Sequence, residues 1–370
     1  MTYFPTGAIV AAPTTSLPEA VGGSRNWDYR YTWIRDASMT LQALWVAACP
    51  DEAGKFFQFL ATAVASQLPA GDLQIMYGVG GEHDLSEREL AHLPGWRSSS
   101  PVRVGNGAWH QRQLDVYGEL LDAAATLPDY LAALDPDTHR FLADAADAAA
   151  SRWQDTDQGI WEVRGEPCHF LHSKLMCWVA VDRAISLADV LGARDRIPAW
   201  EEARDQIAGA IHAHGWSDAA NAYTQAFGSD ELDASSLLLS IVGFLPADDP
   251  RMLATIEAIE QRLTDSRGLV YRYRAGDGLR ARRARSCSVP SGSRRPSPSP
   301  DTRNAHGKSS GVPRDSPLIW GCWPKKSRRT ATNCWGIFRR PSVTLVASTP
   351  RGPSVPRSTR RRLMTFLVPE

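Results

Sequence analysis

The sequence predicts an all-α fold for residues 1–279, and three observations support this prediction. Helical periodicity recurs in one segment after another, and alternating runs of β-branched residues are scarce. The chain of 370 residues is 43% hydrophobic and 22% charged, which is enough for a large core. This composition excludes disordered, collagen-like and small disulfide-stabilised proteins. We therefore expect a large helical domain with a substantial buried core.

The predicted helices follow one another with short irregular linkers. In residues 111–126, apolar side chains recur with the i, i+3, i+4, i+7 spacing of an amphipathic helix, which predicts a buried helix with one solvent-facing side. The alanine-rich segment 137–153 begins next to aspartates, which favour the positive end of a helix. The complete set of predicted helices is 36–48, 53–67, 111–126, 137–153, 172–191, 198–213, 233–243 and 250–264.

The C-terminal quarter of the chain differs in kind from the rest. Residues 1–279 contain 21 Lys and Arg against 38 Asp and Glu, a net charge of −17, whereas residues 280–370 contain 20 against 3, a net charge of +17. The second segment also holds 12 of the 25 prolines, is rich in serine and has no sustained helical or strand period. We predict a helical domain over 1–279 and an unstructured basic tail over 280–370.

Three loops between the helices are rich in aromatic, charged and glycine residues. They cover residues 22–37, 77–111 and 157–173. An aromatic ring stacks on the apolar face of a sugar, and charged groups hold its hydroxyls through charge-assisted hydrogen bonds. Trp and Tyr also commonly close the edge of a core, so each loop alone permits either interpretation. Three such loops in one chain favour a carbohydrate-binding cleft.

Several longer motifs in these segments resemble one family. The first runs from TYFPTGAIVAAP at residue 2 to TWIRDAS at residue 38. The others follow in the family's order and are PVRVGNGAW with QLDVYGELLD, GIWEVRGEPCHFLHSKLMCWVAVDRA, LDASSLLLSIVGFLPADDPRM and GLVYRYR. Together they resemble the catalytic domain of glycoside hydrolase family 15, which includes bacterial glucoamylases, glucodextranases and trehalases. The resemblance implies an incomplete (α/α)6 toroid, an inner ring of helices inside an outer ring, with the active site where loops meet at one end.

The resemblance makes Glu162 of GIWEVRG the general acid that protonates the glycosidic oxygen. An oxocarbenium-like transition state requires a proton on the leaving oxygen, and desolvation beside Trp161 can raise the pKa of a carboxyl group so that it holds one near neutrality. Glu166 is the nearest rival for this role. Without the family motif, a surface carboxylate salt-bridged to Arg164 is the simpler interpretation of either residue.

The resemblance also implies sugar contacts around this acid. Arg35 and Asp36 of WIRDA resemble the pair that holds hydroxyls of the non-reducing-end glucose, and Tyr29 and Trp33 resemble the pocket wall. An adjacent Arg and Asp at a helix start are also compatible with a cap and a salt bridge, since Asp stabilises a helix N-terminus. The full set of implied substrate-binding residues is Tyr29, Trp33, Arg35, Asp36, Trp96, Trp161 and Arg272.

The sequence does not predict a metal site. His169 and His172 lie three residues apart beside the acid, followed by Lys174, and no third ligand accompanies them. We interpret these histidines as hydrogen-bonded residues of the loop and the helix start. The six cysteines form no C-x-x-C pair, so neither a zinc ribbon nor a redox motif is predicted. We expect no catalytic metal and no cofactor.

The carboxylate needed to activate water is missing from its expected place. An inverting glycosidase uses a general base on the opposite face of the sugar. In the family this base is a Glu in a motif like GEEGAFLLC after the VYRYR segment, whereas this chain reads RARRARSCSVPSGSRRPSPSP. Shifting the frame of GC-rich codons permits GEEGAFLLC within residues 280–300 and GNFPQAFSH within residues 317–346. We interpret the tail as family coding sequence translated out of frame.

The predicted function is hydrolysis of α-glucosidic bonds, in trehalose or at α-glucan ends, with inversion of configuration. The main alternative is a catalytically dead fragment that at best binds sugar. A third hypothesis is a nucleic-acid-binding tail in which Trp320, Trp323 and Trp335 stack on bases. We disfavour it because the frame shift explains the same composition.

Composition also predicts where the protein works and with what partners. The sequence has no run of about 18 apolar residues, and its N-terminus lacks the basic and apolar regions of a secretory signal. We expect a cytoplasmic protein whose partner is a small sugar or oligosaccharide, with neither nucleic acid nor membrane as a partner.

Overall fold

The computed structural model describes residues 1–274 except 19–20, 47–49, 65–72, 127 and 267. The chain divides into two compact units. The first comprises Met1–Arg262 with Tyr273–Ala284, and the second comprises Leu263–Arg272 with Arg285–Glu370. Apart from Leu263 at the end of the last helix, every helix and strand of the described residues belongs to the first unit. The predicted boundary at 279–280 and the predicted unstructured tail lie outside the described residues.

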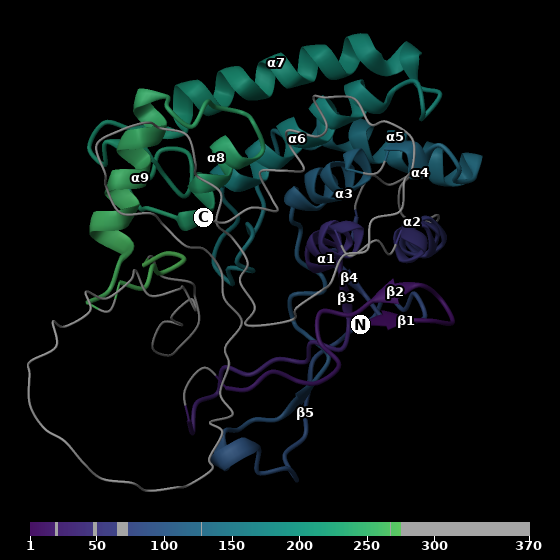
Figure 1. Ribbon diagram of the computed structural model, residues 1–370. Helices are drawn as coiled ribbons and strands as arrows, with labels where there is room; N and C mark the ends of the chain where they lie inside the picture. The colour runs from purple at the N-terminus through teal and green to yellow at the C-terminus, as the bar shows by residue number, and fades with distance from the viewer. Residues whose placement is uncertain (19–20, 47–49, 65–72, 127, 267, 275–370) are drawn as a thin grey trace, which may run out of the picture. The chain divides into compact units, whose positions relative to one another are not determined.

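Helices dominate the first unit, as Figure 1 shows. The prediction of an all-α fold is confirmed. The helices are α1 Ile34–Val46, α2 Pro50–Val64, α3 Asp115–Ala125, α4 Pro128–Leu131, α5 Pro136–Arg152, α6 Leu171–Leu187, α7 Ile197–His214, α8 Leu238–Ile241 and α9 Pro250–Leu263.

Two observed helices depart from the predicted bounds. The helix predicted from residue 111 starts at Asp115, and the N–H of Leu114, just before it, donates to the buried Asp157 carboxylate at 2.9 Å. The helix predicted over 233–243 is a 3-10 turn, Ala234–Leu237, followed by α8. The Asp233 carboxylate accepts from the Ser235 N–H and caps the start of this turn.

Short paired strands, which the periodicity did not predict, connect segments of the loops by hydrogen bonds. Each sheet of the described residues has two antiparallel strands of two residues. The pair that matters most for function joins the segment before α1 to a distant loop, with Trp33 opposite Met76. The pairs are β1 Thr2–Tyr3 with β2 Ala8–Ile9, β3 Thr32–Trp33 with β4 Met76–Tyr77, β5 Arg88–Glu89 with β6 Arg103–Val104, and β7 Trp216–Ser217 with β8 Ala222–Tyr223.

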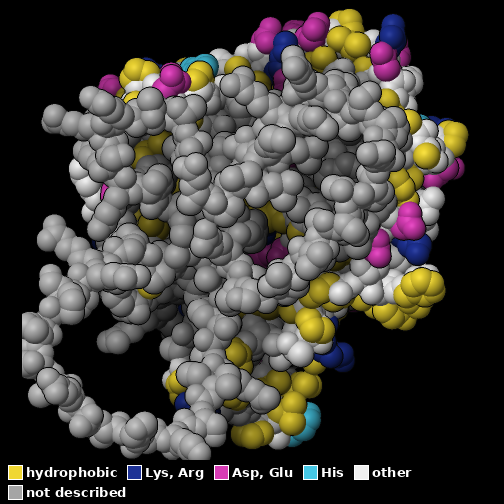
Figure 2. Space-filling model, in the orientation of Figure 1, with side chains coloured by type: hydrophobic (Ala, Val, Ile, Leu, Met, Phe, Trp, Pro, Cys, Tyr) yellow, Lys and Arg dark blue, Asp and Glu magenta, His cyan; other side chains and the backbone are white. Residues whose placement is uncertain are grey.

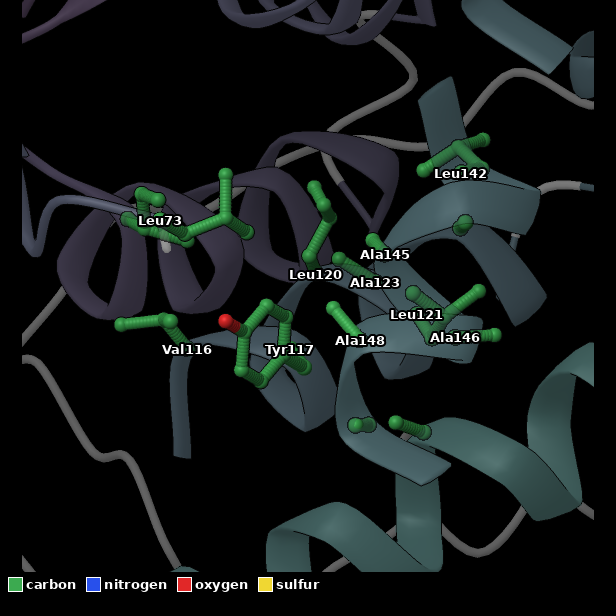
Figure 3. Close-up of a cluster of buried hydrophobic side chains, with 14 of the residues drawn as sticks. Leu73, Val116, Tyr117, Leu120, Leu121, Ala123, Leu142, Ala145, Ala146 and Ala148 are labelled. Carbon is green, nitrogen blue, oxygen red and sulfur yellow. The ribbon is translucent and has the colours of Figure 1, made fainter. Parts of the chain in front are cut away.

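Helix α3 lies at the centre of the core and packs against α1, α5 and α6. Figure 3 shows Leu120 and Leu121 of α3 among the small and apolar side chains of α5. The sequence predicts one solvent-facing side for this helix, and that prediction is wrong. Asp115 and Glu119, on the expected wet side, are 0% and 7% exposed because neighbouring helices cover them.

Gly118 permits the close approach of α3 to α6. A Cβ added there would lie 2.1 Å from the main-chain oxygen of Met176. We expect Gly118→Ala to destabilise the fold by about 1–3 kcal/mol or more, because the two helix backbones must separate. Gly209→Ala on the exposed side of α7 is the matched control, since nothing lies within 4 Å of its added Cβ. Thermal unfolding should show a lower midpoint for the first variant alone, and equal midpoints would contradict the packing role of Gly118.

The outer face of α7 is strongly charged. In the orientation of Figures 1 and 2, acidic and basic side chains gather along the upper edge, where α7 lies. Glu201, Glu202 and Asp205 are among its exposed residues. None of the helices in the described part of the chain is long and apolar enough to cross a membrane.

Candidate active site

Glu162 lies on a closed loop between α5 and α6. Asp157 and Cys168 pair at the base of this loop, each N–H donating to the other's carbonyl at 3.0 and 2.9 Å. The loop turns tightly at Gly159, where an added Cβ would lie 2.8 Å from the Phe170 ring. Glu162 itself has a φ of 55°, a left-handed conformation that residues with side chains rarely adopt. Such backbone conformations concentrate at functional sites, so the loop geometry points to Glu162.

The Glu162 carboxylate is held by two donors from the segment around the start of α1. Its Oε1 accepts a hydrogen bond from Trp33 Nε1 at 2.8 Å and lies 3.6 Å from Arg35 Nη2. Burial raises the pKa of Glu162 above its ordinary value, while the charge of Arg35 and the N–H of Trp33 oppose the rise. The side chain remains 27% exposed. A carboxyl group in this setting keeps its proton to higher pH than an ordinary Glu and remains accessible to a substrate.

Arg35, in the first turn of α1, connects three parts of the structure. Its Nη1 donates to Asp115 Oδ2 at 2.8 Å and to Gln113 Oε1 at 3.0 Å, while its Nη2 faces Glu162. Asp36, the next residue, is exposed. A purely local cap and salt bridge between Arg35 and Asp36 does not account for this geometry, because the ion pairs of Arg35 reach α3 and the Glu162 loop.

Two glutamines join Arg35 to the backbone of the Glu162 loop. Gln113, which accepts from Arg35, donates through Nε2 to Gln111 Oε1 at 3.1 Å. Gln111 Nε2 in turn donates to the carbonyls of Glu162 and Val163, both at 3.3 Å. The sequence interpretation missed both residues. The available signal was the polar run HQRQ directly before the buried helix α3.

Comparisons with known proteins agree on one family. Residues 1–283 match the family described as Glycosyl hydrolases family 15. The chain belongs to this family. It is 47% identical over 290 residues to a trehalase of Mycolicibacterium smegmatis, covering 75% of this chain and 42% of that protein. It is 38% identical over 278 residues to a trehalase of Thermoplasma acidophilum, covering 75% and 47%. The chain thus spans less than half the length of these curated relatives.

Solved structures show the fold of this family 15 domain. A glycosidase in complex with glucose matches with a TM-score of 0.56 at 21% identity, over 72% of this chain and 67% of that one. A bacterial glucoamylase complexed with acarbose matches with a TM-score of 0.55 at 18% identity, over 73% and 39%. The (α/α)6 class that the motifs imply is confirmed by these matches together with the family.

Behind Arg35, the family 15 domain buries three ionisable side chains together. Asp115 and Glu119 lie one turn apart on α3, His172 lies at the start of α6, and a ligand atom of each lies within 4.8 Å of the others. Burial lowers the pKa of His172 to about 4 and raises the pKa of Glu119 well above its ordinary value. Within the described residues, neither ring nitrogen of His172 has a hydrogen-bond partner. The prediction of a hydrogen-bonded His172 is wrong, because α6 directs its ring into the packed interior, with Nδ1 3.8 Å from Asp115.

Among the described side chains, this cluster is the one arranged to hold a cation. Arg35 already supplies a positive charge 2.8 Å from Asp115, and burial opposes charging of both His172 and Glu119. The expectation of no catalytic metal stays a prediction. Of the other two residues beside the acid, His169 stacks on Phe227 with ring centroids 6.3 Å apart. The buried ammonium of Lys174 donates to a main-chain carbonyl.

Aromatic residues of this family 15 domain contact Glu162 in the structure or lie next to it in the sequence. Trp33 is 3% exposed. The Tyr29 and Trp33 rings meet edge to face, with centroids 5.8 Å apart. Trp161, directly before Glu162, donates from Nε1 to Asp233 at 2.8 Å. The structure therefore joins Trp33 to the acid by a direct hydrogen bond and leaves Trp161 anchored elsewhere.

Glu166 and Arg164 lie apart from the buried network. Glu166 is exposed. The Arg164 guanidinium lies over the Trp27 ring at 5.2 Å, and its Nη2 lies 3.6 Å from Glu87 Oε2. Within the described residues no ion pair joins Arg164 to either Glu162 or Glu166, so the simpler salt-bridge interpretation does not hold for this loop.

Among the described residues, no hydrogen bond or ion pair joins Trp96 to the Glu162 network. Trp96 starts a 3-10 turn, Trp96–Ser98, is 47% exposed, and carries the Arg97 guanidinium over its ring at 4.8 Å. Arg272 belongs to the second compact unit. Sugar contacts for both residues stay predictions of the family resemblance.

The buried pair of Arg35 and Asp115 is expected to contribute strongly to stability. We expect Asp115→Asn to lower the free energy of unfolding by about 3–5 kcal/mol, because it removes the counter-charge of a largely buried guanidinium. Asp122→Asn on the same helix is the control. Its pair with Arg183 is partly exposed, so the loss should be about 0–1 kcal/mol. Urea unfolding measures both, and equal losses would contradict the role of Asp115.

Proposed function

We propose that this chain carries the acid half of a trehalose-hydrolysing active site that inverts the anomeric carbon. The observation that carries the proposal is the Glu162 carboxyl. It is partly buried with a raised pKa, hydrogen-bonded by Trp33 and faced by Arg35, yet it remains partly exposed. A carboxyl group with these properties protonates a leaving glycosidic oxygen.

The surrounding side chains suit a glucose ring next to this acid. Arg35 and the exposed Asp36 provide a donor and an acceptor for sugar hydroxyls at the start of α1. Tyr29 is partly exposed and provides aromatic surface for the apolar face of the sugar, whereas the buried Trp33 supports the Glu162 carboxyl group through its indole N–H. The trehalase relatives, which are 47% and 38% identical to this chain, favour trehalose among the α-glucosides, and the residues that match the family include these loops.

A sugar-binding chain without hydrolytic activity is the second candidate. It is favoured by the sequence of residues 280–370, which lacks the family's GEEGAFLLC-like motif and so the matched base. Inversion requires that base to activate water on the opposite face of the sugar. The two candidates share Glu162 and its neighbours and differ in whether bound trehalose is cleaved.

A substrate series with anomer detection tests the proposal. The chain as written and a version with the reading frame restored at codon 280 are incubated with trehalose, maltose and isomaltose while NMR follows the released glucose. We expect the restored protein to cleave trehalose fastest and to release α- and β-glucose in equal amounts, because the attacked glucose inverts to the β-anomer and the leaving glucose keeps its α-configuration. Release of only the α-anomer would exclude inversion, and faster cleavage of maltose or isomaltose would exclude trehalose as the preferred substrate. Calorimetric binding of trehalose without cleavage by either protein would support the second candidate.

A further inference from the structure

The motif LDASSLLLS has no part in the site described so far, yet it contains a buried acid. Asp233 is 2% exposed and precedes the 3-10 turn Ala234–Leu237. Its Oδ1 accepts a hydrogen bond from the Ser235 N–H at 2.7 Å, which caps that turn. Capping uses one carboxylate oxygen, and the second oxygen is directed to a different part of the domain.

The second oxygen of Asp233 holds the residue before the proposed acid. Oδ2 accepts from Trp161 Nε1 at 2.8 Å and from Gln225 Nε2 at 3.0 Å. A carboxylate accepts through both oxygens, whereas an amide offers one oxygen and would turn an N–H₂ group toward one of these donors. A carboxylate at position 233 therefore accepts hydrogen bonds from all three donors, whereas an amide would leave at least one of them without an acceptor.

A second contact to the Trp161 ring comes from Tyr273, the bridge partner of Asp233. Asp233 forms a main-chain bridge with Tyr273, and the Tyr273 ring lies 6.2 Å from the Trp161 ring at an interplanar angle of 30°. Asp233 thus holds the indole N–H, and the tilted ring of its bridge partner Tyr273 contacts the same indole. Glu162 follows Trp161 directly in the chain and has the positive φ described above. A change in the backbone of Trp161 would therefore move the Glu162 carboxyl group.

We infer that Asp233 is a positioning residue that fixes the Trp161 indole and thereby the placement of the Glu162 carboxyl group. The expected change in kcat rests on the proposed function, whereas the expected change in the surroundings of Trp161 does not. Asp233 acts through Trp161 and touches no substrate. Loss of the carboxylate releases the indole N–H and loosens the acid loop, and small displacements of a catalytic group carry large losses of rate.

The structural half is tested on the full chain as written by ¹⁹F NMR with 5-fluorotryptophan. Trp161→Phe assigns the Trp161 resonance by its disappearance. We expect Asp233→Asn and Asp233→Ala to shift and broaden that resonance. Asp135→Ala is the matched control, because Asp135 caps α5 through Thr138 without contacting a tryptophan. An unchanged Trp161 resonance in both Asp233 variants would overturn the inference whether or not the chain hydrolyses trehalose.

The kinetic half uses the frame-restored protein. We expect Asp233→Ala and Trp161→Phe each to lower kcat about 10-fold to 100-fold, and the double variant to be no slower than the slower single variant. Asp135→Ala should keep the parental kcat. If the two losses of kcat multiplied in the double variant, or if Asp233→Ala kept a kcat within twofold of the parent, the positioning role would be overturned. A restored protein that cleaves no substrate would instead refute the proposed function and leave the NMR result standing.

Discussion

Glu162→Gln in the frame-restored protein is expected to lower the rate of glucose release from trehalose by about 10²–10⁴-fold. The amide keeps the size and the Trp33 hydrogen bond of the carboxyl group but has no proton to give to the leaving oxygen. The loss should shrink for a glucosyl fluoride, whose leaving group needs no proton. Initial rates on the two substrates, measured with the same protein preparations, give the comparison.

The pH dependence of the same variant supplies an independent check. A general acid works only while protonated, so the parental rate should fall as the pH rises through the pKa of Glu162. Burial raises that pKa, which places the decline at higher pH than for an ordinary Glu. This limb of the profile should disappear in Glu162→Gln. The exposed Glu166→Gln should keep both rate and profile, and a Glu162→Gln rate within a few-fold of the parent on trehalose would refute the assignment.

Restoring the reading frame at codon 280 is expected to raise trehalose hydrolysis by about 10²-fold or more. In the proposed mechanism the chain as written keeps Glu162 as the proton donor but lacks the family-matched carboxylate that would activate water. Asp277 is the nearest carboxylate in sequence to the lost motif and lies outside the described residues. Catalytic groups must be held to within about 0.5 Å, so a chance replacement from a nearby position is not expected to compensate.

Two controls keep this comparison interpretable. Limited proteolysis of the chain as written should remove residues 280–370 before the helical domain is cut, in line with the predicted unstructured tail. Calorimetric titration with trehalose shows whether both versions present a sugar-binding site. Equal hydrolysis rates for the two versions would mean that the sequence of residues 280–370 does not deprive the site of its general base, or that another residue supplies this base.

The sequence alone determined the helical class and the family, and it predicted the loop for the acid. Periodicity located α5 and α7 to within about two residues at each end, because a buried stripe repeats with the helical period. The motif GIWEVRG predicted a role for Glu162 because a sequence motif can be recognised without knowing which residues surround it in the fold. Helical period and motif are both local features, and local features can be read from a single sequence.

Only the tertiary structure decided which charges are buried. Asp115 and Glu119 lie on the polar side of an amphipathic pattern, and a carboxylate in such a pattern is normally solvated. Helices α1, α5 and α6 surround α3 and bring Arg35 and His172 onto that side.

The same holds for the contacts that place the acid. Asp233 meets Trp161 across 72 residues of sequence, and Trp33 meets Glu162 across 129. No periodic pattern encodes such pairs, because the energy of a buried charge or indole N–H depends on the partner that the packed chain brings to it.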